Sequence, residues 1–250
     1  MGSTGAFGND FGGTGIKGAP VDLSTGDFAA ERVRFKTPAH STPAAVAEVF
    51  AELLAQFPET DGPVGVTVPG VVRHGVVRSA ANIDRSWIGT DADAVFTQAT
   101  GRDVHVVNDA DAAGLAEVRF GAAAGRTGLI ILTTLGTGIG SALINDGVLV
   151  PNTELGHLEI DGHDAETRAA NSAREREELS WEAWAKRLTR YYRTLEQLFS
   201  PDLFLVGGGV SKHGEEFLPL LDIDTEIIPA TLLNKAGVVG AALYASESAG

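Results

Sequence analysis

The stretch Asp10-Phe11-Gly12-Gly13-Thr14-Gly15-Ile16-Lys17 contains a glycine loop that recurs as Leu135-Gly136-Thr137-Gly138-Ile139-Gly140-Ser141. Each loop is followed by a short strand-like run and a turn, Ser24-Thr25-Gly26 in the first copy and Asn145-Asp146-Gly147 in the second. Because glycine lacks a Cβ atom, consecutive backbone N–H groups can close around phosphate oxygens. Two matched loops therefore predict two similar lobes that hold one phosphate chain.

The composition describes a chain with a real core and an acidic surface. It has 250 residues, of which 44% are hydrophobic, a formal net charge of -14 and no cysteine. No apolar run approaches the roughly 18 residues of a membrane span, so we expect no membrane partner. The negative charge argues against nucleic-acid binding, and the lack of cysteine fits a reducing compartment. We expect a cytoplasmic protein.

Strand-like and helical patterns alternate along the chain, which favours an α/β fold with helices covering the sheets. Strand-like runs cover 64–68, 104–107, 129–134, 139–144 and 203–206, and helical patterns cover 43–57, 181–199 and 236–245. We place the lobe boundary near 108–112, with an N-terminal lobe of residues 1–110 and a C-terminal lobe of residues 111–250. The final helix is a candidate to pack back on the first lobe.

One residue breaks the pattern of the first strand. If residues 7–11 form a strand, Asn9 shares a face with Phe7 and Phe11. A polar side chain among aromatic rings needs a hydrogen-bond partner, which the sequence does not identify.

Asp10 stands at the end of this strand, directly before the first glycine loop. In phosphoryl transfer such a carboxylate can hold Mg²⁺, directly or through water, while the turn N–H groups and Thr14 face the phosphates. Alternatively, Asp10 only orders a hairpin turn. The second glycine loop favours the functional interpretation.

Asp109 follows the strand-like run 104–107 and lies at the start of a helical pattern. From there it could accept a proton from a substrate hydroxyl. Alternatively it caps the helix, a role for which Asp111 is better placed.

The segment Glu154-Leu155-Gly156-His157, with Glu159, Asp161, His163, Asp164 and Glu166 after it, is rich in metal-type ligands. Its spacing matches no standard zinc pattern, so we favour a sugar site in which these groups accept hydrogen bonds from hydroxyls. A carboxylate-and-histidine metal site is the alternative. A third glycine run, Gly207-Gly208-Gly209, allows close backbone approach or simply makes a tight strand-to-helix turn.

From Asp10 to about Ala245 the chain resembles the ROK family of sugar kinases, within the actin-like and hexokinase-like ATPases. The two glycine loops resemble the family's phosphate motifs, Gly208 and Gly209 lie in its nucleotide-side turn, and Asn108-Asp109 matches the pair that carries the catalytic base. Glu154 and His157 match its sugar-binding motif. The resemblance further implies sugar contacts for Gly70, Asn82 and Glu166. It implies a two-lobed, ribonuclease H-like α/β fold with a cleft between the lobes.

The resemblance also has departures. Many family members continue the sugar motif with a cysteine cluster that binds structural zinc, whereas this chain has no cysteine there. No zinc site is therefore expected. This continuation, with 79–87 and 198–204, is similar to the polyphosphate glucokinases of actinobacteria.

The resemblance implies a homodimeric kinase that transfers a terminal phosphoryl group to the 6-hydroxyl of glucose, with Asp109 as base and Mg²⁺ as cofactor. Inorganic polyphosphate is the expected donor, supported by Lys17 in the first loop, and ATP is a weaker or alternative donor. The alternatives are a strictly ATP-dependent hexose kinase and a non-catalytic, sugar-sensing protein. A regulator would need a DNA-binding module ahead of the first phosphate motif, and nine residues precede Asp10.

Overall fold

The computed structural model describes residues 5–80 and 82–249. They form two compact units, the first running up to Ala116 and resuming at Asn234, the second spanning Glu117–Leu233. The chain leaves the first unit within helix α3 (Asp109–Phe120), a few residues beyond the boundary expected near 108–112. It returns just before helix α8 (Ala236–Ser248), which packs on the first unit.

The first unit is built on a sheet with the strand order β3-β2-β1-β5-β8, in which β4 also pairs with β2. The strands are β1 (Gly5–Gly12), β2 (Gly15–Asp22), β3 (Asp27–Phe28), β4 (Val33–Phe35), β5 (Val64–Val68) and β8 (Val104–Asn108). Strands β1, β5 and β8 are parallel, whereas β1 and β2 form an antiparallel hairpin. The strands predicted at 64–68 and 104–107 are confirmed. A separate hairpin of β6 (Val72–Arg73) and β7 (Val76–Val77) precedes the short helix η1 (Arg85–Trp87).

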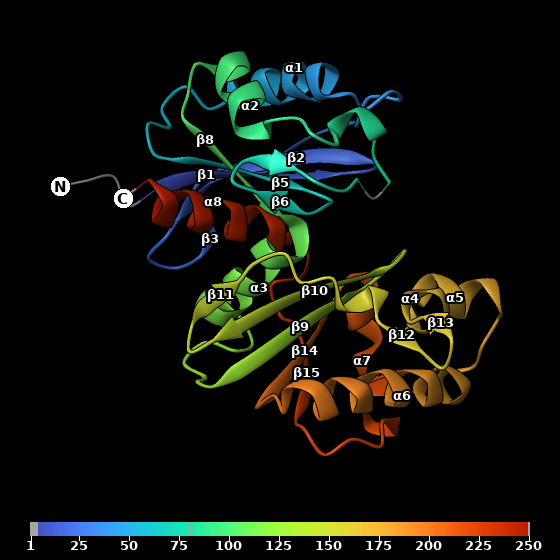
Figure 1. Ribbon diagram of the computed structural model, residues 1–250. Coiled ribbons are helices and arrows are strands. Elements are labelled where there is room, and N and C mark those ends of the chain that lie inside the picture. Colours follow the sequence, from blue (N-terminus) through green and yellow to red (C-terminus); the bar gives the residue numbers. More distant parts are fainter. Residues whose placement is uncertain (1–4, 81, 250) are drawn as a thin grey trace. The chain divides into compact units, whose positions relative to one another are not determined.

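Helices cover both faces of this sheet (Figure 1). Helices α1 (Pro43–Leu54) and α2 (Ala92–Thr100) lie on one face, where Phe7 packs against Phe50. Helix α8 lies on the other face, where a Cβ atom at Gly8 would collide with the carbonyl of Val238. Because successive strand residues point to opposite faces, the pair Phe7 and Gly8 fills one face and leaves room for a close helix on the other.

Helix α1 starts as predicted but ends earlier. The Thr42 hydroxyl accepts a hydrogen bond from the Ala45 amide at 3.4 Å, and Pro43 is the first helical residue. The helix ends at Leu54 and not immediately before Pro58, because the next residues form tight turns.

Asn9 is fully buried on the α1 face of β1. The hydrogen-bond partner that its position requires is not found: within residues 5–80 and 82–249, neither its Oδ1 nor its Nδ2 is bonded. An unpaired buried amide opposes folding.

The second unit is built on a sheet with the strand order β11-β10-β9-β14-β15. Its strands are β9 (Leu129–Leu135), β10 (Ile139–Asn145), β11 (Val148–Val150), β14 (Leu203–Gly207) and β15 (Ile227–Pro229). Strands β9 and β10 form an antiparallel hairpin, whereas β14 runs parallel to β9 and β15. The strands predicted at 129–134, 139–144 and 203–206 are confirmed. Like the first hairpin, β9–β10 carries its glycine loop at the turn.

The long helix α6 (Trp181–Phe199) begins where the helical pattern predicts, and the Ser180 hydroxyl caps it by accepting from the Ala183 amide at 3.2 Å. Its apolar face joins the core of the second unit, and the buried hydroxyls of Tyr192 and Thr133 lie 2.7 Å apart. Tyr191 is buried as well.

Smaller elements complete the second unit. They are η2 (Leu155–His157), β12 (Glu159–Ile160), β13 (His163–Asp164), α4 (Glu166–Ala169), α5 (Asn171–Arg176), η3 (Gly209–His213), α7 (Gly214–Phe217), η4 (Leu218–Leu220) and η5 (Leu233–Lys235), the last crossing into the first unit. In the part of the chain that the structure describes, no helix combines the length and apolarity that a bilayer span requires.

Candidate active site

In the first unit, Asp10 lies near the end of β1, beside the turn Gly13-Thr14 that joins β1 to β2. Its Oδ2 lies 3.0 Å from Nζ of Lys17, and its Oδ1 accepts a hydrogen bond from the Thr67 hydroxyl at 3.2 Å. Thr67 in turn accepts from the Phe11 amide at 3.1 Å. The carboxylate is thus oriented by two neighbouring strands.

The start of helix α8 lies against this carboxylate. A Cβ atom at Gly237 would be 3.1 Å from the Asp10 carboxylate carbon, so a side chain there would crowd it. Amides at a helix N-terminus favour nearby negative charge. The helix N-terminus therefore favours the negative charge of the Asp10 carboxylate, which remains partly exposed.

The glycines of the first hairpin lie in and beside the turn that joins β1 to β2. Gly12 and Gly15 pair across the turn, and a Cβ atom at Gly13 would lie 3.3 Å from the Asn82 carbonyl oxygen. Asn82 has a positive φ of 60°. The structure thus brings the predicted sugar residue Asn82 next to the predicted phosphate turn.

Asn108, Asp109 and Gly70 also meet in the first unit. Nδ2 of Asn108 donates to the Gly70 carbonyl at 3.0 Å, and Oδ1 of Asn108 accepts from the amides of Ala110 and Asp111 at 2.8 and 3.1 Å. The Asn108 side chain therefore caps α3, the role that the sequence pattern favoured for Asp111. Asp109 is exposed at the first residue of α3, where its Oδ1 accepts from the Ala110 amide at 3.0 Å.

In the second unit, the turn Gly136–Gly138 is braced from two sides. The Ser172 amide donates to the Gly136 carbonyl at 3.0 Å, and the Ser172 hydroxyl donates to the Thr137 carbonyl at 2.6 Å. On the other side, Oε2 of Glu166 accepts from the Ile139 amide at 2.9 Å. Glu166, predicted to contact sugar, therefore also holds the second phosphate turn.

The third glycine run lies beside this hairpin. Gly208 has a φ of 84° and adjoins the backbone of Leu135, so that a Cβ atom there would lie 2.6 Å from the Leu135 carbonyl oxygen. A Cβ atom at Gly209 would meet open space. The predicted nucleotide-side turn and the predicted second phosphate loop are therefore neighbours in the second unit.

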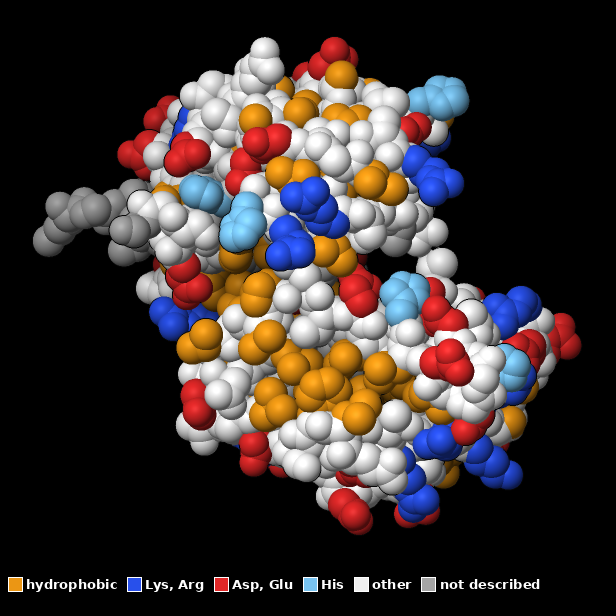
Figure 2. Space-filling model, in the orientation of Figure 1, with side chains coloured by type: hydrophobic (Ala, Val, Ile, Leu, Met, Phe, Trp, Pro, Cys, Tyr) orange, Lys and Arg blue, Asp and Glu red, His pale blue; other side chains and the backbone are white. Residues whose placement is uncertain are grey.

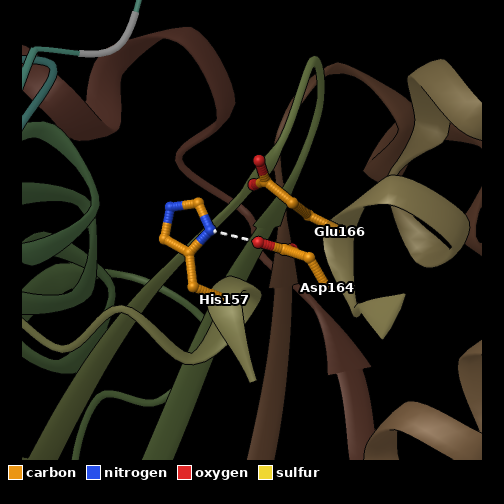
Figure 3. A group of neighbouring side chains, drawn as sticks. All are labelled: His157, Asp164 and Glu166. Carbon is orange, nitrogen blue, oxygen red and sulfur yellow. Dashed lines mark hydrogen bonds and ion pairs between the residues drawn. The ribbon is translucent and has the colours of Figure 1, made fainter. Parts of the chain in front are cut away.

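His157, from the predicted sugar motif, lies beside Asp164 and Glu166 (Figure 3). Nδ1 of His157 lies 2.9 Å from Oδ2 of Asp164, and Nε2 of His157 lies 3.9 Å from Oε2 of Glu154. The hydrogen bond to Asp164 raises the pKa of His157, and the charges of Glu166 and Glu154 add to this effect. Partial burial raises the pKa of Glu154; nearby His157 opposes the shift and Glu166 adds to it.

Two metal questions can be tested on these residues. His157, Asp164 and Glu166 each offer one ligand atom, and these three atoms lie within 4.8 Å of one another. Their geometry therefore allows a metal site of oxygen and nitrogen ligands. The segment lacks the thiolates that are typical of structural zinc sites. Asp10 suits Mg²⁺, which takes few protein carboxylates and keeps several waters. With both carboxylate oxygens already partnered, Asp10 fits a water-mediated contact best.

Two contributors to these sites escaped the sequence-based prediction. Thr67 is an ordinary residue of a predicted strand, and only its register opposite Asp10 brings it to the carboxylate. Asp164 stood among the metal-type ligands of its segment, but nothing in the spacing paired it with His157.

The chain is similar to known proteins over most of its length. The model of the ROK family matches residues 6–172. The chain is 52% identical to a polyphosphate glucokinase of Mycobacterium tuberculosis over 95% of its own length and 89% of that protein. It is similar to the crystal structure of an inorganic polyphosphate/ATP-glucomannokinase from Arthrobacter sp. strain KM, with 56% identity, a TM-score of 0.92 and coverage of 98% and 100%.

A more distant solved structure shares the fold. It is a ROK family glucokinase from Streptomyces griseus in complex with glucose and AMPPNP, with 25% identity, a TM-score of 0.81 and coverage of 97% of this chain and 99% of that one. The predicted two-lobed α/β kinase fold is confirmed by these matches. Because the family model covers more than half of the chain, the protein belongs to the ROK family.

Proposed function

We propose that this protein is a glucokinase that transfers the terminal phosphoryl group of inorganic polyphosphate, and less efficiently of ATP, to the 6-hydroxyl of glucose. The observation that carries the proposal is the 52% identity to a polyphosphate glucokinase over 95% of the chain. The glucomannokinase that resembles this chain is described as using both donors. The glycine hairpins, Asp109 and the His157 cluster supply residues for each part of that reaction.

Asp109 is the proposed general base. It is exposed at the start of α3, and the Asn108 cap fixes the backbone that carries it. Its carboxylate takes the proton of the glucose 6-hydroxyl as the hydroxyl oxygen bonds to the terminal phosphorus. The bond from that phosphorus to the bridging oxygen breaks, and the donor leaves one phosphate shorter. Proton transfer of this kind contributes roughly a hundred- to ten-thousand-fold to the rate.

Besides Asp109, six residues are proposed to contact sugar hydroxyls. Gly70, Asn82 and Asn108 belong to the first unit, and Glu154, His157 and Glu166 belong to the second. Carboxylates accept hydrogen bonds from hydroxyls, and amide and imidazole groups both donate and accept, which suits a sugar with several hydroxyls.

The proposed phosphate-binding residues are Asp10, Gly12, Gly13, Thr14, Gly15 and Lys17 in the first unit, and Gly136, Thr137, Gly138, Gly208 and Gly209 in the second. Their backbone N–H groups, with the ammonium of Lys17, offset the charge of the phosphates. Bound Mg²⁺ would neutralise part of the charge that develops in transfer, and Asp10 would hold it through water.

We further propose that the enzyme is a cytoplasmic homodimer. Figure 2 shows hydrophobic side chains gathered on the surface of the second unit. Among residues 5–80 and 82–249, strand β11 pairs with β10 alone and carries the exposed side chains of Val148 and Val150. An exposed apolar edge strand is suited to pairing with a second copy of the chain. Light scattering at micromolar concentration should give about twice the chain mass of 26.0 kDa, and a monomer mass would contradict the dimer.

The test of the donor assignment compares kcat/KM for polyphosphate and for ATP, each with glucose and Mg²⁺, in protein freed of nucleotide. We expect glucose 6-phosphate from both donors and the higher kcat/KM with polyphosphate. Activity with ATP and none with polyphosphate would refute the polyphosphate assignment while leaving the glucokinase assignment intact. No product with either donor would refute both.

A further inference from the structure

His157 and Asp164 form a hydrogen-bonded pair in the second unit. Nδ1 of His157 lies 2.9 Å from Oδ2 of Asp164 (Figure 3). An ionised carboxylate only accepts hydrogen bonds, so Nδ1 must carry the hydrogen. The pair therefore sets the tautomer and the rotation of the ring. It leaves Nε2, which is 3.9 Å from Glu154 and beyond hydrogen-bond distance, for another partner.

Asp164 is itself held in place by a short hairpin. Strands β12 and β13 pair Glu159 with Asp164, and the turn residues Asp161 and Gly162 both have positive φ, at 53° and 76°. Two such residues form the compact turn whose twist matches an antiparallel pair. The Thr167 hydroxyl adds a hydrogen bond to the Asp164 carbonyl at 2.6 Å.

The hairpin is tied to helix α6 at its turn. Nη2 and Nε of Arg190 donate to the two carboxylate oxygens of Asp161 at 2.8 and 3.0 Å. A two-bond contact of this type fixes geometry as well as distance. A continuous set of contacts thus runs from α6 through the hairpin to the ring of His157.

We propose that Asp164 is a positioning residue, which holds the His157 ring so that Nε2 meets a hydroxyl of the sugar. The inference deepens the glucokinase function proposed above and rests on it. Asp164 touches neither sugar nor donor in this role and acts only through His157. A hydrogen bond donated by the other ring nitrogen to a carboxylate is the usual means of fixing a functional histidine.

The same pair controls the charge of the ring. The groups that face His157 are Asp164, Glu154 and Glu166, and all three favour the protonated imidazolium. Below the pKa of His157, Nε2 donates to a sugar oxygen, whereas above it Nε2 accepts from a sugar hydroxyl. Removal of the Asp164 charge should move this change to lower pH.

The test compares Asp164→Asn and Asp164→Ala with the wild-type protein. Asn keeps the shape and an acceptor oxygen but removes the charge, whereas Ala removes both. Asp224→Asn is the matched control, because Asp224 is exposed on the same unit and the substitution changes the net charge equally. Three quantities are measured: the KM for glucose, kcat, and the titration of the His157 ring by NMR in glucose-free protein, with its signal assigned through His157→Gln.

We expect Asp164→Ala to raise the KM for glucose about tenfold, the scale of a lost charged hydrogen bond, with a smaller change in kcat. Both Asp164 variants should lower the pKa of His157, and Asp164→Asn should shift the pH dependence of KM to lower pH. The control should leave all three quantities unchanged. Folded Asp164 variants with wild-type KM and an unshifted His157 titration would overturn the proposal.

These outcomes are separable from a failure of the proposed function. If the wild-type protein does not phosphorylate glucose, that result alone refutes the proposed function. The NMR titration needs no activity, so an unshifted His157 in Asp164→Asn overturns the positioning role in any case. Melting temperatures show whether each variant is folded, and the near-isosteric Asn variant preserves the hairpin if the Ala variant does not.

Discussion

Nζ of Lys17 lies 3.0 Å from Oδ2 of Asp10, so the proposed Mg²⁺-associated carboxylate and the proposed phosphate-binding cation form a salt bridge across the first hairpin. The two side chains are about one quarter exposed, at 26% and 22%. An ammonium in this position can turn from the carboxylate to a phosphate without leaving the site.

We predict that Lys17→Gln weakens donor binding. Loss of a charged hydrogen bond to phosphate should raise the KM for polyphosphate roughly tenfold, with little effect on the KM for glucose. Initial rates at varied polyphosphate and saturating glucose measure this. Arg73→Gln, at an exposed position of the same unit, is a suitable control. Equal KM values for the Lys17 variant and the control would show that Lys17 does not touch the donor.

We predict that the single substitution Asn9→Val stabilises the folded protein. Because both of its buried side-chain polar atoms lack partners within residues 5–80 and 82–249, Asn9→Val removes an unpaired amide and adds a residue suited to a strand. The free energy of unfolding should rise by about 1–3 kcal/mol, as measured by urea denaturation. Asn108→Val, which removes a bonded amide, should have the opposite sign. A destabilised Asn9→Val protein would show that the amide has a partner in solution.

The raised pKa of Glu154 predicts a pH-dependent stability. A group that holds its proton more tightly in the folded state contributes stability that is complete below its unfolded pKa, near 4.5, and is lost as pH rises through the folded pKa. Glu154→Gln removes this dependence. The melting temperature of the variant should therefore rise relative to wild type between pH 3.5 and 6, where His157 stays largely protonated. A constant difference over that range would contradict the shift.

We expect the purified protein to hold no stoichiometric zinc. The segment that follows the Glu154–His157 motif offers carboxylates and histidines but no thiolate. Elemental analysis of protein purified without chelator measures this, and a zinc-selective chelator should leave the melting temperature unchanged. One equivalent of zinc per chain would instead assign the neighbouring ligand atoms of His157, Asp164 and Glu166 to a metal.

The parts of the fold that the sequence predicted are those set by local chemistry. The glycine turns of the β1–β2 and β9–β10 hairpins, and the Asp146-Gly147 turn between β10 and β11, could be located because these signals act within a few residues. The predicted helix starts at Pro43 and Trp181 are equally local, and the hydroxyls of Thr42 and Ser180 cap them. The end of α1 was less predictable, because residues 55–57 can either continue the helix or form tight turns, and they form turns.

The contacts that the sequence did not predict depend on which residues two strands pair, and on which of several neighbouring side chains caps a helix. Thr67 reaches Asp10 only because β1 and β5 pair these two residues, which are 57 positions apart. Asn108 rather than Asp111 caps α3 because its side chain stands one residue before the helix and reaches two amides. Spacing alone cannot separate such neighbouring candidates.

The central claim is that Asp109 acts as the general base of a glucose kinase, and the turnover of Asp109→Asn tests it most directly. Asn keeps the size of the side chain but cannot take the proton. With saturating glucose, polyphosphate and Mg²⁺, kcat should fall by roughly two to four orders of magnitude. The melting temperature and the affinity for glucose should change much less. Asp61→Asn, at an exposed position of the same unit, should retain wild-type turnover. A kcat for Asp109→Asn within a few fold of the Asp61→Asn control would contradict the account.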